Sequence, residues 1–86
     1  MTEVGFSVKR LDGLYRLFVE GLGEPLILSS DLLGHALGLI FGPDAAVPFK
    51  EVVDGEAGQL TGRPWVTAGQ LEALRVLIGV YRQLRL

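Results

Sequence analysis

Apolar and polar residues alternate along the first quarter of the chain, which is typical of a β-hairpin. The pair Asp12-Gly13 separates two alternating runs, residues 4–11 and 14–20. An Asp-Gly pair suits a two-residue type I′ turn, because both of its central positions need a positive φ. Such a turn fixes the strand register, and it gathers the large apolar side chains on one face of the predicted hairpin. These are Val4, Phe6, Val8, Tyr15, Leu17 and Val19.

The next segment predicts a third strand followed by a helix. Residues 26–28 are a short apolar run that is compatible with a strand. Residues 29–31 read Ser-Ser-Asp, and such side chains cap the free N–H groups at the start of a helix. The predicted helix reaches about residue 41, because Gly42-Pro43 is a strong signal for the end of a helix.

The segment after this helix predicts a second hairpin. Residues 49–53 are compatible with a strand, and Asp54-Gly55 follows as a turn. Residues 59–61 are a weak return strand, and a longer loop over residues 54–58 is equally compatible with the pattern. Trp65 lies in the connection that follows, and its size predicts a buried anchor.

The last part of the chain predicts the longest helix. Thr67 and Gln70 have the spacing of a capping box, and an apolar-periodic run extends from residue 71 to residue 84. The predicted order of elements is β-β-β-α-β-β-α. This order indicates a single α+β domain over residues 1–86, with an antiparallel sheet and two helices packed on one of its faces.

The composition narrows the class of protein. The chain has 86 residues, 49% of them apolar, no Cys and a net charge of −2. This apolar content excludes intrinsic disorder, and the lack of Cys excludes a disulfide framework. We expect no stretch that is both long and apolar enough to span a bilayer. The N-terminus lacks the basic and apolar regions of a signal peptide, so we expect a cytoplasmic protein with no membrane partner.

Groups that carry catalysis or bind metals are scarce. Asp31 and His35 are four residues apart on the first predicted helix, but a metal site needs three or four ligands. The chain offers no Cys and no second His. The glycine-rich stretches contain neither the dinucleotide-binding fingerprint nor a P-loop lysine. We therefore interpret Asp31 and His35 as a surface pair, and we predict a protein that is not an enzyme and has no cofactor or metal.

The final helix carries more apolar surface than one sheet contact requires. Its polar sector covers only about 100° of the helix circumference. The surplus indicates contact with a second copy or with another protein, unless the first helix covers it. We predict a protein–protein interaction domain that forms a homodimer through Leu74, Ile78, Tyr81 and Leu84, with Arg82 at the rim.

The alternative hypothesis is a weak nucleic-acid-binding domain. Lys9 and Arg16 lie on the polar face of the first hairpin together with Phe18. Cations beside an exposed aromatic ring on a sheet face are one way in which proteins bind RNA. The negative net charge, and Glu20 on the same face, argue against nucleic acid and place this hypothesis second.

Overall fold

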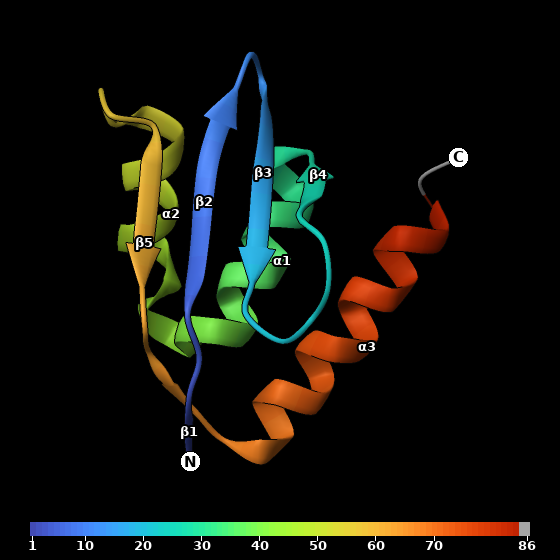
Figure 1. Cartoon of the computed structure of the whole chain (residues 1–86). Helices are drawn as coiled ribbons and strands as arrows, with labels where there is room; N and C mark the ends of the chain where they lie inside the picture. The colour runs from blue at the N-terminus through green and yellow to red at the C-terminus, as the bar shows by residue number, and fades with distance from the viewer. Residues whose placement is uncertain (85–86) are drawn as a thin grey trace.

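The computed structural model describes residues 1–84, and its main element is a four-stranded antiparallel sheet (Figure 1). The strand order is β4-β3-β2-β5. The strands are β2 (Phe6–Leu11), β3 (Leu14–Val19), β4 (Leu26–Leu28) and β5 (Gln59–Gly62). A smaller two-stranded sheet pairs β1 (Thr2–Glu3) with β6 (Trp65–Val66). The α+β class and the antiparallel pairing are confirmed.

The first hairpin forms as the sequence predicts. Asp12 and Gly13 have φ angles of 55° and 86°, as a type I′ turn requires. The register pairs Val8 with Leu17, which places both side chains on the inner face of the sheet. Turn chemistry and apolar alternation specify the same register, and therefore this region needs no distant contact to define it.

Helix α1 (Ser30–Phe41) also lies where the sequence predicts it. The side chain of Ser29 accepts a hydrogen bond from the backbone N–H of Leu32 at 3.4 Å, and Gly42 ends the helix with a φ of 63°. The buried face of α1 packs against the inner face of the sheet through Leu33, Ala36, Leu37 and Ile40.

The predicted strand at residues 49–53 is wrong. This segment belongs to helix α2 (Ala46–Asp54), which follows the short 3-10 helix η1 (Gly42–Ala45). A segment of five residues is too short for its apolar pattern to distinguish a strand from a helix. Here the period is helical: Val52 is fully buried, while Val53 and Phe49 lie against the core.

The second predicted hairpin is therefore absent, and two contacts explain what replaces it. Strand β5 pairs with β2, with Leu60 opposite Val8, and not with residues 49–53. The guanidinium of Arg10 donates to the carbonyl oxygens of Val52 and Val53 at 3.2 and 2.8 Å. A cation that satisfies free carbonyl groups stabilises the C-terminal end of α2.

Helix α3 (Ala68–Leu84) completes the core. The predicted capping box is confirmed, because Gln70 N–H donates to Thr67 Oγ1 at 3.0 Å and Thr67 N–H donates to Gln70 Oε1 at 2.8 Å. The Gln70 amide also donates to the carbonyl oxygen of Leu39 at 3.1 Å, which fixes α3 beside α1. Helices α1 and α2 lie behind the sheet, and α3 begins below it and rises on the side where β4 lies (Figure 1).

Two further expectations are corrected. Trp65 is 61% exposed, because it pairs with Glu3 at the surface as part of β6 and does not enter the core. The continuous helical stretch Ser30–Asp54 is long and apolar enough to cross a membrane by length and composition alone, contrary to the expectation that no stretch would be. Its α1 part packs against the sheet through its buried side chains.

Candidate functional site

The predicted interface on α3 lies mostly inside the domain. Leu74, Ile78 and Tyr81 are 2%, 5% and 6% exposed and belong to the same core cluster as the inner face of the sheet. The choice of these three residues for contact with a second copy is therefore corrected, because α1 and the sheet already cover them. Leu84 is exposed. Arg82 donates to the carbonyl oxygens of Leu22 and Glu24 at 3.0 and 2.6 Å, and it thereby holds the loop before β4.

A second apolar stripe lies on the opposite side of α3. We call it the outer stripe, and it consists of Gly69, Ala73, Val76 and Val80. The two valines are 58% and 47% exposed. The stripe lines an open groove of about 510 Å³, which Leu39 of α1, Glu72 and Leu77 complete. The surplus apolar surface predicted for this helix therefore exists, but on the face that the prediction did not select.

One polar pair flanks the outer stripe. Arg75 Nε lies 3.6 Å from Glu72 Oε2 in an ion pair within α3, and both side chains are more than half exposed. Because an exposed pair of this kind contributes little to folding, these side chains are free to exchange partners without a large loss of stability. The outer stripe is thus an apolar surface with one negative and one positive charge along the same side.

A signal for the outer stripe is present in the sequence. Its members are spaced by four, three and four residues, which is the spacing of a surface that packs against another helix. The buried stripe has the same kind of spacing, from Leu71 through Leu74 and Ile78 to Tyr81. Periodicity identifies both stripes equally, and only the tertiary structure shows which of them the domain itself covers.

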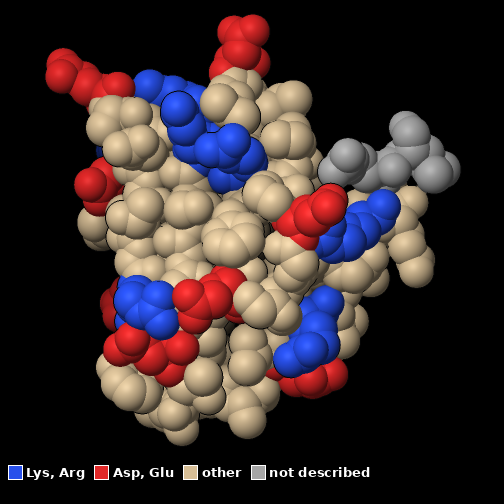
Figure 2. Space-filling model, viewed as in Figure 1, with Lys and Arg blue, Asp and Glu red and all other residues tan. Residues whose placement is uncertain are grey.

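The outer face of the four-stranded sheet is the second candidate surface. Residues 1–84 leave it uncovered, and Figure 2 shows basic side chains gathered over the upper part of β2 and β3. Lys9 and Arg16 are directly opposite each other on these central strands. Phe18 lies two residues farther along β3 on the same face and is 39% exposed. The structure therefore brings together the three residues of the nucleic-acid hypothesis.

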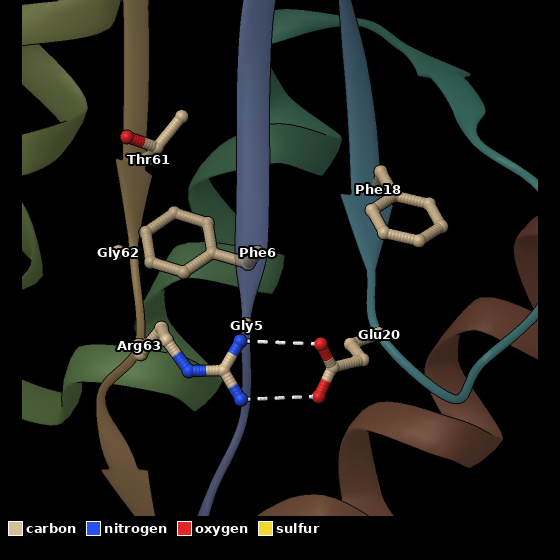
Figure 3. Close-up of a pocket in the computed structure, with 7 residues that line it drawn as sticks. All are labelled: Gly5, Phe6, Phe18, Glu20, Thr61, Gly62 and Arg63. Carbon is tan, nitrogen blue, oxygen red and sulfur yellow. Dashed lines mark hydrogen bonds and ion pairs between the residues drawn. The ribbon is translucent and has the colours of Figure 1, made fainter.

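A shallow hollow of about 360 Å³ lies beside Phe18, as Figure 3 shows. Phe18 and Thr61 form its walls, and the Arg63–Glu20 ion pair lies over Gly5. Its lower end is closed by the guanidinium of Arg63. This hollow was not predictable from the sequence, because it forms only where β5 lies beside the first hairpin, about 50 residues away along the chain.

The lower end of the hollow holds one cation between two carboxylates, Glu20 and Glu3. Arg63 donates two hydrogen bonds of 3.2 Å to the two carboxylate oxygens of Glu20, and a third of 2.8 Å to Glu3. The Arg63 guanidinium holds the pKa of Glu20 below its ordinary value of 4.5, chiefly through hydrogen bonding and then through charge attraction. Glu20, which argued against an anionic ligand, is therefore paired with a cation.

One buried polar group remains without a partner among the described residues. The hydroxyl of Tyr81 makes no hydrogen bond within residues 1–84, and burial raises the pKa of Tyr81 above its ordinary value of 10.0. Tyr81 also lines a small hollow of about 140 Å³ with Ile27, Leu32 and Leu84. An unpaired buried hydroxyl costs stability.

The described chain holds no group of three His, Cys, Asp or Glu side chains that is arranged to bind a metal ion. Asp31 and His35 are both exposed on α1. No protein-family model, no curated protein and no solved structure matches the chain. The two surfaces, the outer stripe of α3 and the open face of the sheet, therefore provide the basis for proposing a function.

Proposed function

We propose that this protein is a non-enzymatic interaction domain that forms a homodimer through the outer stripe of α3. The observation that carries the proposal is the apolar groove along this helix, with Val76 and Val80 about half exposed. Exposed apolar residues in a continuous stripe are typical of a contact surface, whereas single exposed ones are ordinary. The groove lies on a long, capped helix, which is a rigid platform for a partner helix.

The order of residue sizes favours a second copy in the antiparallel direction. The N-terminal half of the outer stripe is small, with Gly69 and Ala73, and the C-terminal half is larger, with Val76 and Val80. A two-fold axis between positions 74 and 75 places each Val80 against Gly69 of the other copy. The same axis places each Val76 against Ala73. Large side chains then fill the places where small ones leave room, as close helix packing requires.

The flanking charges are complementary in the same arrangement. The two-fold axis leaves each polar flank beside the same flank of the second copy. Glu72 then lies within about 3 Å, measured along the helix axis, of Arg75 of the second copy. The ion pair that exists within one helix is thereby available across the contact, twice by symmetry. Opposite charges at matched positions favour this register over a shifted one.

Cysteine cross-linking tests the arrangement directly, because the chain has no Cys of its own. We would prepare the single variants Gly69→Cys and Val80→Cys and oxidise each alone and as a mixture. Antiparallel pairing separates the two copies of position 69 by about 16 Å along the helix, which is too far for a disulfide. The mixture brings position 69 of one copy opposite position 80 of the other, so a covalent dimer should form only there.

The alternatives give different products. A parallel helix pair would cross-link each variant with itself, and would contradict the antiparallel arrangement. The matched control is Glu56→Cys, an exposed position far from α3, which should give no dimer alone or in either mixture. The proposal is contradicted if the mixture of the two α3 variants gives no more covalent dimer than the control does at the same concentration.

A further inference from the structure

The open face of the sheet contains a pair of like charges that folding alone does not explain. Lys9 and Arg16 are directly opposite each other on neighbouring strands, where like charges destabilise a sheet. Within residues 1–84 the ion pairs involve Arg63 and Arg75, and neither Lys9 nor Arg16 takes part in one. A costly and unpaired arrangement of charge at the centre of an uncovered face indicates a site for an anion.

The surroundings of this pair specify more than charge. Phe18 lies on the same strand face as Arg16, two residues away, which is about 7 Å along a strand. Its ring forms one wall of the hollow, and the Arg63–Glu20 ion pair closes the lower end (Figure 3). A planar group that enters the hollow from its open side can stack on the ring, above the Arg63–Glu20 ion pair that lies over Gly5. An anionic group of the same ligand can then reach Lys9 and Arg16.

We propose that the open face binds a phosphorylated nucleoside unit, with the base stacked on Phe18 and the phosphate held by Lys9 and Arg16. One sugar joins base and phosphate in such a unit, which matches the short step from Phe18 to Arg16. Thr61 lines the opposite wall. A free nucleotide and one residue of a single-stranded nucleic acid share this chemistry. The inference is independent of the α3 dimer, since it uses no residue of that helix.

The test is a titration of ¹⁵N-labelled protein at low salt, followed by backbone amide shifts. The ligands are adenosine monophosphate in one arm and a short oligothymidylate in the other. We expect saturable shifts at positions 9, 16 and 18 in at least one arm. A clearly tighter oligonucleotide assigns the site to single strands, and equal affinity assigns it to free nucleotides. With two phosphate contacts, binding of the oligonucleotide should weaken about sevenfold between roughly 50 and 200 mM salt.

Three variants separate a ligand site from general charge attraction. Phe18→Leu keeps an apolar side chain but removes the stacking ring, and should weaken binding about fivefold or more. Lys9→Gln should weaken binding and at the same time raise the urea midpoint, because it relieves the repulsion with Arg16. Lys50→Gln is the matched control, with the same change in charge on the exposed surface of α2, and should do neither.

Several results would overturn the proposal. One is the absence of shifts at positions 9, 16 and 18 with both ligands at low salt. Another is an equal loss of binding in Lys50→Gln and Lys9→Gln. A third is a polyglutamate peptide that produces the same shifts with the same affinity as the oligonucleotide, because the site would then recognise charge alone.

Discussion

Helix α3 has two apolar stripes, and they differ in what covers them. The inner stripe carries large side chains, Leu74, Ile78 and Tyr81, which pack into the core with α1 and the sheet. The outer stripe carries small ones, and no described element packs over its valines. One stripe is sufficient to hold a helix on a domain of this size. The comparison shows that the surplus apolar surface of α3 is available for a partner.

The four-stranded sheet shows a similar division. Its inner face buries Val8 and Leu17 almost completely. Its outer face places Lys9 opposite Arg16. In both elements the covered side follows the rules of a stable core, and the uncovered side departs from what folding alone would favour. The uncovered sides are therefore where we place function.

The largest expected effect on folding comes from the inner stripe. Leu74→Ala removes a side chain that is almost fully buried, and the surrounding core can collapse only partly into the space. We expect the free energy of unfolding to fall by about 3 kcal/mol. Urea denaturation measures this change. Val76→Ala on the outer stripe should lower the unfolding free energy of the monomer by less than about 0.5 kcal/mol. Equal losses of unfolding free energy at both positions would contradict the assignment of one stripe to the core and the other to the surface.

Tyr81→Phe tests a defect within the inner stripe. The change removes the hydroxyl that lacks a hydrogen bond within the described residues, and leaves the ring in place. We expect the protein to become more stable by about 1 kcal/mol at neutral pH. A loss of stability at neutral pH would show that the hydroxyl has a partner that supports the fold.

The pH dependence of the same variant gives a second reading. Because burial raises the pKa of Tyr81, the native state keeps this proton at a pH at which the unfolded chain releases it. Unfolding then releases a proton, and stability falls as the pH rises above about 10. Tyr81→Phe should lose this part of the alkaline decline, as urea midpoints at increasing pH would show. An unchanged decline in the variant would contradict the burial of this group.

The smallest expected effect concerns the charges beside the outer stripe. Glu72→Arg places like charges at the contact between copies, and should weaken the dimer by about 0.5–1 kcal/mol, or about two- to fivefold. Adding Arg75→Glu restores opposite charges and should recover most of the affinity. Analytical ultracentrifugation of the three proteins, at equal salt and over the same concentrations, gives the dissociation constants to compare. Additive losses in the double variant would contradict pairing between these two positions.

The parts of the fold that local chemistry specifies were predictable from the sequence. The turn at Asp12-Gly13, the cap at Ser29 and the capping box of Thr67 with Gln70 all act within a few residues of one another. Helix α2 was not predictable in this way. Its C-terminal carbonyls depend on Arg10, more than 40 residues earlier in the chain, and the run from 49 to 53 fits either kind of element.

The candidate surfaces were likewise predictable from the sequence only in part. The width of the apolar arc on the last helix predicted a surplus, and the cations and ring on the first hairpin were visible in its alternation. Which apolar stripe becomes core depends on where α1 and the sheet lie, and therefore Leu74, Ile78 and Tyr81 were assigned to the wrong contact. The hollow beside Phe18 depends on Gly5, Thr61 and Arg63 meeting across three strands.

The most direct test of the central claim is the native mass in solution, measured by size-exclusion chromatography with light scattering over a range of concentrations. The 9.3 kDa chain should elute with twice its mass, and the double variant Val76→Glu with Val80→Glu should elute as a folded monomer. The control Val47→Glu, at an even more exposed apolar position on α2, should remain a dimer. A wild-type protein that stays monomeric at every concentration, or a double variant that still dimerises, would contradict the role assigned to the outer stripe of α3.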